Sequence, residues 1–237
     1  MRVLLQPAFI LHRRPYRDTS LLLEAFSHEH GRLGLVARGA ASVRSRLKSV
    51  LQPFVPLLLS WSGTGDLAAL TAAEETGRPA PLPPGQVLAG LYVNELLVRL
   101  LPRQDPLPRL FIAYRMLLVE LAAADAEPPL RRFEKRLLEA LGYGLSLDRD
   151  AASGTPIVAE QHYCYVLDRG PLVADSGVSG VPISGRGLLA LRDGMLTDPA
   201  VLREVKRLTR AALAEQLRGR VLKTRELYRV KREPESE

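Results

Sequence analysis

Residues 38–48, RGAASVRSRLK, combine four cations with small residues and contain no acid. Small residues let a phosphate backbone approach closely, arginine and lysine supply charge to neutralise it, and the two serines add hydrogen-bond donors. The alternative interpretation is a solvent-exposed loop with incidental arginines. Because no acid balances the cations, we favour a polyanion-binding loop whose charged residues are Arg38, Arg44, Arg46 and Lys48.

A second basic cluster surrounds the dipeptide Pro15-Tyr16 and consists of Arg13, Arg14 and Arg17. The Tyr16 ring can stack on a nucleic-acid base, although packing on the rim of a domain is the more common role of such a tyrosine. Aromatic residues make up only 5% of the chain, so a large stacking platform is not expected. Binding of a polyanion here should be mainly electrostatic.

The predicted helix over residues 200–217 carries a third group of cations. On a helical wheel, Val201, Val205, Leu208 and Ala212 form an apolar face. The opposite stripe holds Arg203, Lys206, Arg207 and Arg210. A solvated face is the common explanation for such a stripe, and a polyanion site is the other.

The distribution of charge favours a polyanion partner. The formal net charge is +7. It is concentrated at the two ends of the chain, with +6 in residues 1–60 and +8 in residues 203–232, whereas residues 81–200 sum to −2. This asymmetry indicates a polyanion partner more strongly than the net charge does.

Four further cations begin a helix predicted after Pro128-Pro129, namely Arg131, Arg132, Lys135 and Arg136. Cations beside apolar residues on a helix can hold an acidic, hydrophobic peptide tail. The alternative is a surface helix whose cations pair with Glu134 and Glu139.

Enzyme classes find little support in the residues. Two of the four histidines, His28 and His30, are spaced i, i+2, which is not the HExxH metalloprotease pattern. Cys164 is the only cysteine and lies in an apolar stretch typical of a buried thiol, so neither a disulfide nor a cysteine zinc site is expected. No nucleotide-binding GxxxxGK[ST] or GxGxxG motif occurs. We therefore expect no catalytic residues, no metal and no cofactor.

Apolar alternation and turn residues predict five short strands before residue 77. Five strands in so short a segment favour an OB-fold, although another small barrel or a mixed sheet remains open. The candidates are residues 8–13, 20–26, 32–38, 51–61 and 66–71.

A proline-rich stretch over residues 78–86 then predicts a linker between domains. Periodic apolar residues after it predict helices over 87–101, 107–121, 128–141, 187–192 and 200–217. The predicted fold class is α+β, with a five-stranded OB-fold barrel over 1–77 and a helical domain over 87–237. The helical domain contains an irregular insertion at about 145–182, in which residues 163–167 and 171–173 form a possible hairpin.

Short motifs in both halves resemble the RecO family of bacterial DNA-repair proteins. They keep the family's order across most of the chain, and together they are fairly specific. The motifs are Arg17-Asp18-x-Ser20, His30-Gly31-Arg32, Ala37-Arg38-Gly39-Ala40, Ser45-Arg46-Leu47, Leu51-Gln52-Pro53-Phe54 and residues 133–143, FEKRLLEALGY.

The resemblance implies a recombination mediator. Such a protein binds single- and double-stranded DNA, anneals complementary strands, and helps load RecA with RecR and single-strand-binding protein as partners. Many family members carry a four-cysteine zinc site after the LGY motif, and this chain departs from them because residues 145–180 contain only Cys164. The acidic tail of single-strand-binding protein is the expected ligand of the cations at 131–136.

No long apolar segment or signal peptide is evident, so we expect a cytoplasmic, nucleoid-associated protein. The alternative function is a protein–protein adaptor that binds acidic partners and does not bind DNA.

Overall fold

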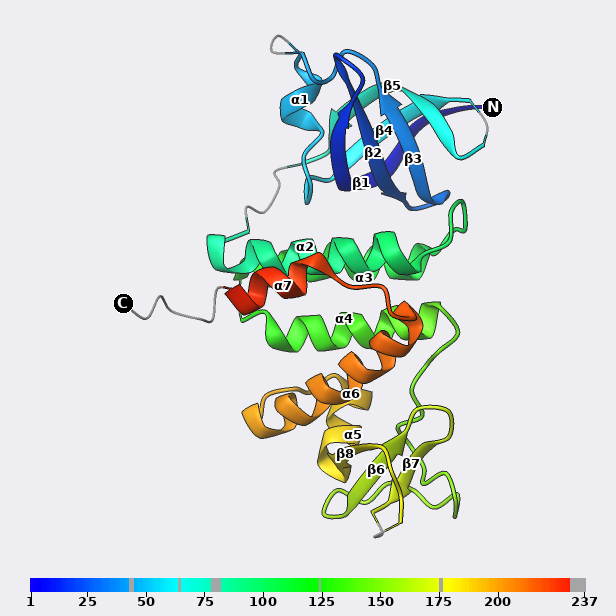
Figure 1. Ribbon diagram of the computed structural model, residues 1–237, viewed down its shortest axis with the longest axis vertical. Coiled ribbons are helices and arrows are strands. Elements are labelled where there is room, and N and C mark those ends of the chain that lie inside the picture. The colour runs from blue at the N-terminus through cyan, green and yellow to red at the C-terminus, as the bar shows by residue number, and fades with distance from the viewer. Residues whose placement is uncertain (43–44, 64, 78–81, 124, 175–176, 231–237) are drawn as a thin grey trace. The chain divides into compact units, whose positions relative to one another are not determined.

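The computed structural model describes residues 1–42, 45–63, 65–77, 82–123, 125–174 and 177–230. The chain packs as two compact units (Figure 1). Unit 1 comprises residues 1–124 and 222–237, and unit 2 comprises residues 125–221. Within the described ranges, no helix is both long and apolar enough to cross a membrane.

The N-terminal half of unit 1 is a closed five-stranded barrel, which confirms the predicted fold class. Its strands are β1 (Arg2–Tyr16), β2 (Ser20–Ser27), β3 (Gly31–Ala37), β4 (Leu57–Ser62) and β5 (Leu67–Glu75). They are ordered β1-β2-β3-β5-β4, with β4 returning to β1. Every pair is antiparallel except β3 and β5, which run parallel. A short helix, α1 (Leu47–Val50), lies between β3 and β4.

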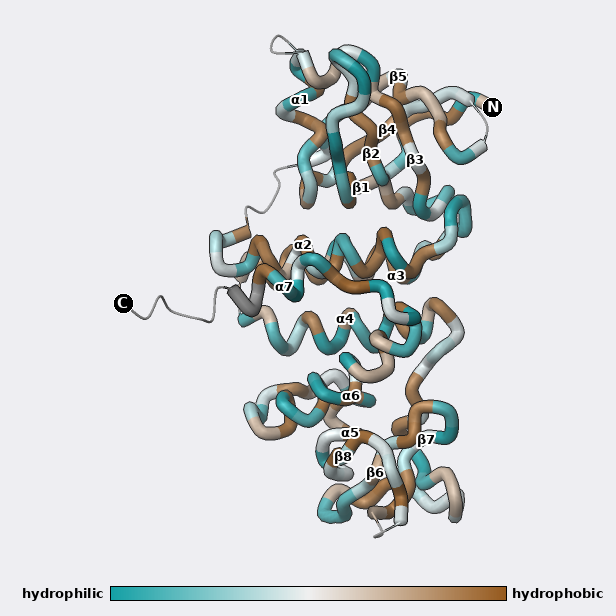
Figure 2. The backbone as a smooth tube through the Cα atoms, viewed as in Figure 1, coloured by the Kyte–Doolittle hydropathy of each residue, from teal (hydrophilic) through white to brown (hydrophobic). Residues whose placement is uncertain are grey.

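The barrel closes because alternate side chains of each strand are apolar. In β2, Leu21, Leu23 and Ala25 point into the core, whereas Leu22 and Glu24 are only half-buried. Figure 2 shows the barrel strands largely in the hydrophobic colour. Period-two alternation buries one face of a strand and leaves the other face to a ligand or a neighbouring element.

Three helices pack in the same unit as the barrel: α2 (Pro84–Leu100), α3 (Pro108–Ala123) and α7 (Lys223–Val230). Phe111 of α3 lies against Phe9 and Phe26 of the barrel, with ring centroids 5.4 and 5.5 Å apart. Tyr114 meets the Phe9 ring edge-on at 5.1 Å. Rings at these separations add stabilisation beyond the apolar area that they bury.

A buried polar link joins α2 to the barrel. The Asn94 side-chain amide donates to the Leu11 carbonyl at 2.9 Å, and the Tyr114 hydroxyl donates to Asn94 Oδ1 at 2.6 Å. Complete burial of Tyr114 raises the pKa of its hydroxyl, so the group stays protonated. This link lies within unit 1, which continues through α2 and α3 to residue 124.

Unit 2 contains three helices and a small sheet. The helices are α4 (Glu127–Ala140), α5 (Gly185–Asp193) and α6 (Pro199–Leu217), and the strands are β6 (His162–Val166), β7 (Gly170–Val173) and β8 (Val181–Ser184). The predicted hairpin is confirmed as β6 and β7, and β8 pairs with the other edge of β6. The carboxylate of Asp150 accepts hydrogen bonds from the backbone N–H groups of residues 152, 153 and 173. These bonds link the loop before β6 to β7.

Two sequence-based boundaries were wrong. The strand predicted over 51–61 begins only at Leu57, because prolines 53 and 56 lack backbone donors and Phe54 has a left-handed φ of 70°. Residues 84–86 of the predicted linker belong to α2, where Pro84 occupies the favoured first turn, and residues 78–81 lie outside the described residues. Helices α1 and α7 were not predicted.

Candidate nucleic-acid interface

The outer face of β2, β3 and β5 carries a groove of about 410 Å³. Strand register aligns Arg14 with Leu22 on β2, Leu22 with Val36 on β3, and Val36 with Ala69 on β5. This row crosses the face of the barrel, with the cation Arg14 on β1 and the apolar residues Leu22, Val36 and Ala69 on the next three strands. The groove is lined by Tyr16, Arg17, Thr19, Ser20, Val36, Arg38, Leu67, Ala68 and Ala69.

Arginines border this groove. Arg14, Arg17 and Arg38 are exposed, and none of them forms an ion pair with any residue that the structure describes. The Arg17 guanidinium lies over the Tyr16 ring, 5.2 Å from its centroid. Arg17 has a left-handed φ of 55°, which turns the chain sharply between β1 and β2. The structure therefore brings two of the predicted cations, Arg17 and Arg38, to one groove, and strand register places Arg14 on the same face.

The other predicted cations of the barrel lie near α1. The Arg13 side chain donates to the carbonyls of Lys48 and Leu51, at 3.2 and 3.4 Å, and so ties α1 to β1. Arg46 and Lys48 are exposed at this helix. Arg44 lies outside the described residues. Arg13 is thus a tether whose guanidinium is already engaged, whereas Arg46 and Lys48 present their charge to solvent.

The apolar floor of the groove was missed by sequence reasoning. Leu67 is 47% exposed and lies beside Val36 because β5 pairs in parallel with β3. Gly34 of β3 aligns with Leu67 in the same pairing. No local pattern indicates a parallel pairing between segments that are separated by another strand along the chain. An exposed apolar strip of this kind offers bases a surface on which to stack.

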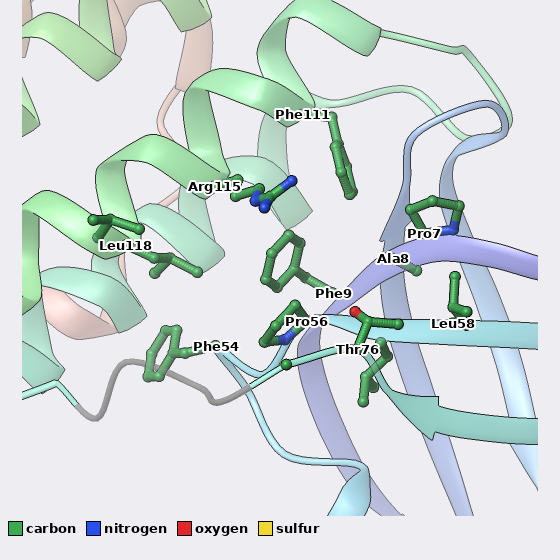
Figure 3. Close-up of a pocket in the computed structure, with 13 residues that line it drawn as sticks. Pro7, Ala8, Phe9, Phe54, Pro56, Leu58, Thr76, Phe111, Arg115 and Leu118 are labelled. Atoms are coloured by element: carbon green, nitrogen blue, oxygen red, sulfur yellow. The ribbon is translucent and has the colours of Figure 1, made fainter.

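A second hollow of about 410 Å³ lies between β1 and α3 (Figure 3). Phe9, Phe54, Phe111 and Leu118 make most of its lining apolar, and among the residues that the structure describes Arg115 is the one cation in that lining. A polyanion needs repeated cations, so this hollow does not match a phosphate backbone.

The predicted stripe on α6 is present in unit 2. Val201, Val205, Leu208 and Ala212 are buried as expected. On the other side, Arg203, Arg207 and Arg210 are exposed.

Lys206 differs from its neighbours on the stripe because its ammonium donates to Glu127 Oε1 at 2.5 Å. Burial tends to raise the pKa of Glu127, but the bond from Lys206 and the charge of Arg131 hold that pKa below its ordinary value. The charge of Lys206 is thus largely neutralised within unit 2.

The four cations of α4 are mostly used inside unit 2. Arg131 is 2% exposed and pairs with the buried Glu134 at 3.1 Å, which does not fit a side chain presented to a partner. Arg132 donates to the Gly194 carbonyl at 3.4 Å, and Lys135 donates to the Arg192 carbonyl at 2.9 Å.

Cations are favoured at a helix C-terminus, and residues 192–194 end α5. Of the four, Arg136 alone is exposed and forms no ion pair in the described part of the chain. For Arg131 and Lys135, pairing within the helix therefore describes the side chains better than binding of a peptide tail does. The Lys135 ammonium also lies 3.6 Å from the Glu139 carboxylate.

Among the residues that the structure describes, no group of three or more His, Cys, Asp or Glu side chains is arranged to hold a metal ion. Cys164 is buried in β6, and its thiol lies 3.5 Å from the Val178 carbonyl.

Comparisons with known proteins agree across both units. Residues 1–77 match the family model described as "Recombination protein O N terminal", and residues 85–226 match "Recombination protein O C terminal". The chain is 51% identical over 229 residues to "DNA repair protein RecO" of Methylococcus capsulatus, covering 96% of this chain and 94% of that protein. It is 50% identical over 230 residues to the protein of the same name from Nitrosococcus oceani, covering 96% and 93%. The Coxiella burnetii protein is 46% identical over 226 residues, covering 95% and 98%.

Proposed function

Because the chain belongs to the RecO family of DNA repair proteins, we propose that its barrel binds single- and double-stranded DNA during recombinational repair. The supporting observation is the groove on the outer face of the barrel, lined by Arg17 and Arg38, with the exposed Arg14 on the same face. OB-folds bind oligonucleotides on this face, between the β1–β2 and β4–β5 loops. Arg17 lies in the first of these loops, and Leu67 directly follows the second.

The groove offers two kinds of contact to a single strand. The arginines neutralise phosphates, which gives affinity that falls with salt. The Tyr16 ring and the strip formed by Val36 and Leu67 accept the faces of bases, which every base possesses. Little sequence preference follows from these contacts, as repair at arbitrary sites requires.

Strand annealing follows from holding two strands near cations. Phosphates of complementary strands repel each other, and cations that neutralise both strands lower that repulsion. The barrel face in unit 1 and the α6 stripe of Arg203, Arg207 and Arg210 in unit 2 each supply such cations. The proposed role is therefore a non-catalytic mediator that helps RecA to load, working in the cytoplasm.

Protein partners of this mediator are proposed to be RecR and single-strand-binding protein. Within α4, Arg136 is the cation best placed to meet the acidic tail of single-strand-binding protein, because its guanidinium is exposed. Arg131 has the opposite character, since its charge is buried against Glu134. A change at Arg136 should thus affect binding of the tail without loss of fold.

The first test is fluorescence anisotropy of a labelled single strand over a salt series. The test variant is R17Q/R38Q, and the matched control is R109Q/R169Q, which removes two exposed arginines far from the groove in sequence. Loss of two phosphate contacts should lower the slope of log K against log salt by about 1.4, at about 0.7 per contact on single strands. The control should keep the slope of the wild type.

Binding that falls with salt, yet persists on DNA coated with single-strand-binding protein, supports a mediator that engages both. A wild-type protein that ignores naked DNA at low salt refutes the proposal. It then favours the protein–protein adaptor, whose basic faces bind acidic partners only.

A further inference from the structure

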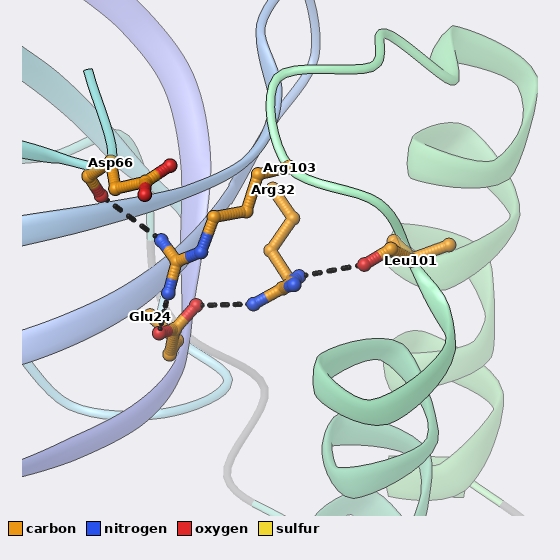
Figure 4. Close-up of polar contacts among 5 residues, drawn as sticks. All are labelled: Glu24, Arg32, Asp66, Leu101 and Arg103. Carbon is orange, nitrogen blue, oxygen red and sulfur yellow. Dashed lines mark hydrogen bonds and ion pairs between the residues drawn. The ribbon is translucent and has the colours of Figure 1, made fainter. Parts of the chain in front are cut away.

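The connection between α2 and α3 lies across one end of the barrel face that carries the groove. Arg103 in this connection forms a parallel bridge with Arg32 of β3, and the backbone N–H of Gln104 donates to the Arg32 carbonyl at 2.9 Å. The Arg32 side chain in turn donates from Nε to the Leu101 carbonyl at 2.9 Å. A segment from outside the barrel is thereby fixed to β3 (Figure 4).

Glu24 of β2 joins the two arginines of this contact. Its carboxylate lies 2.7 Å from Arg32 and 2.5 Å from Arg103. The side chains of Glu24, Arg32 and Arg103 are 17%, 14% and 30% exposed, so water screens these charges only in part. The Glu24 carboxylate thus forms ion pairs with both Arg32 and Arg103. The arginines at the groove, by contrast, form no ion pair with any described residue.

The far side of the connection holds the β4–β5 loop. Arg103 donates from its second terminal nitrogen to the Asp66 carbonyl at 3.1 Å, and Gln104 donates to the Gly65 carbonyl at 2.7 Å. Gly65 has a left-handed φ of 88°, a conformation open to glycine that costs entropy when it is fixed. Leu67, the residue after Asp66, lines the groove.

Gly34 of β3 makes room for these contacts. A Cβ at this position would lie 2.6 Å from the Arg103 guanidinium, 2.7 Å from the Asp66 carbonyl oxygen and 2.8 Å from the Leu67 side chain. Only a residue without a side chain lets all three approach β3 so closely.

We propose that Glu24, Arg103 and Gln104 are positioning residues that hold Gly65 and Asp66 of the β4–β5 loop in place for nucleic acid and do not themselves bind phosphate. The proposal rests on the proposed function of the barrel. Glu24 holds Arg103 in the rotamer that reaches Asp66, and Arg103 and Gln104 hold two successive carbonyls of the loop. The Leu67 side chain is thereby kept beside Val36, where a base is expected to stack.

The test compares variants that break these contacts with and without loss of charge. R103Q removes the guanidinium, whereas G34A keeps every charge and pushes Arg103 and Asp66 away from β3. R109Q removes an exposed arginine of α3 and serves as the matched control. Each full-length protein is titrated with a labelled single-stranded oligonucleotide over a salt series.

We expect R103Q and G34A to bind the oligonucleotide at least about fivefold more weakly than the wild type does. A factor of about five is the lower end of the coupling usually found between linked sites. Their salt slopes should equal that of the R109Q control. A slope that R103Q alone lowers by about 0.7 overturns the proposal, because Arg103 is then a phosphate ligand. Unchanged affinity in both variants also overturns it, while leaving the proposed function intact.

Thermal melts monitored by fluorescence of Trp61, the single tryptophan, establish that each variant is folded at the assay temperature. If either variant unfolds, Q104N carries the test, because it only shortens the side chain that reaches Gly65. Asparagine suits the left-handed φ of 57° at this position. If Q104N binds like the wild type, the loop is not positioned by Gln104 and the proposal falls. A wild-type protein that does not bind DNA defeats the proposed function, and this inference with it.

Discussion

Replacing Asn94 with alanine should destabilise unit 1 more than any other single truncation of a polar side chain on α2. Asn94 is 2% exposed and satisfies two buried groups, the Leu11 carbonyl and the Tyr114 hydroxyl. Each buried group that loses its partner costs about 1–3 kcal/mol, so N94A should lose about 2–6 kcal/mol of the free energy of unfolding. Y114F leaves only Asn94 Oδ1 without its donor and should lose about 1–2 kcal/mol.

The double variant N94A/Y114F separates this account from a simple loss of packing. In N94A the Tyr114 hydroxyl loses its acceptor Asn94 Oδ1, and the second substitution removes that hydroxyl. The double variant should therefore cost less than the sum of the two single variants, by about 2 kcal/mol or more.

Urea unfolding followed by Trp61 fluorescence measures these differences, because the single tryptophan lies in β4 of the barrel. A midpoint that shifts without a change of slope reports stability alone. The reasoning is refuted if N94A lies within about 0.5 kcal/mol of the wild type, the usual range of surface substitutions. It is also refuted if the two substitutions are additive, because their shared hydrogen bond then has no energetic role.

Three further outcomes are expected. The folded-state pKa of Glu127 is lowered, so its pairing with Lys206 stabilises unit 2 above the unfolded pKa of about 4.3. This stabilisation is lost as the pH falls through the folded-state pKa. The difference in unfolding free energy between the wild type and K206Q should be about 0.5–1 kcal/mol at pH 7 and should vanish in thermal melts at acid pH. R131M should cost about 3–5 kcal/mol in denaturant unfolding because Glu134 stays buried. R131M/E134L should recover only part of this loss, because the buried Thr209 hydroxyl then loses its acceptor, and an equally unstable double variant would contradict the account. G31A should lower the melting temperature sharply, because Gly31 has a φ of 62° and the new Cβ would lie 2.0 Å from the backbone carbonyl oxygen of Asp105 in the α2–α3 connection. An unchanged melting temperature would contradict this contact.

Much of the fold was predictable from local patterns. Alternation in β2 and the 3–4 spacing of apolar residues in α6 were recognisable because each period matches one regular backbone geometry. The ends of elements were harder to predict, since Pro84 suggested a linker but occupies the first turn of α2. Helix α7 is supported by a distant residue: Glu95 accepts the backbone amides of Lys223 and Thr224 at its first turn.

The candidate site was predictable only in part. Arg14, Arg17 and Arg38 were recognisable as cations in segments poor in acids. The structure places Arg17 and Arg38 at one groove and Arg14 on the same face. Leu67 was not recognisable as part of that groove, because its position depends on the parallel pairing of β5 with β3.

The sequence by itself determined the kinds of element, the basic ends of the chain and the family, because periodicity, composition and short motifs are written in consecutive residues. Only the tertiary structure decided which cations are available to a ligand. Arg103 is bound by Glu24, a residue 79 positions away, and Arg131 is buried against Glu134 within one helix. Whether a charge is paired depends on which oxygen folding brings within about 3–4 Å of it, and that distance is set by the packing of the whole unit.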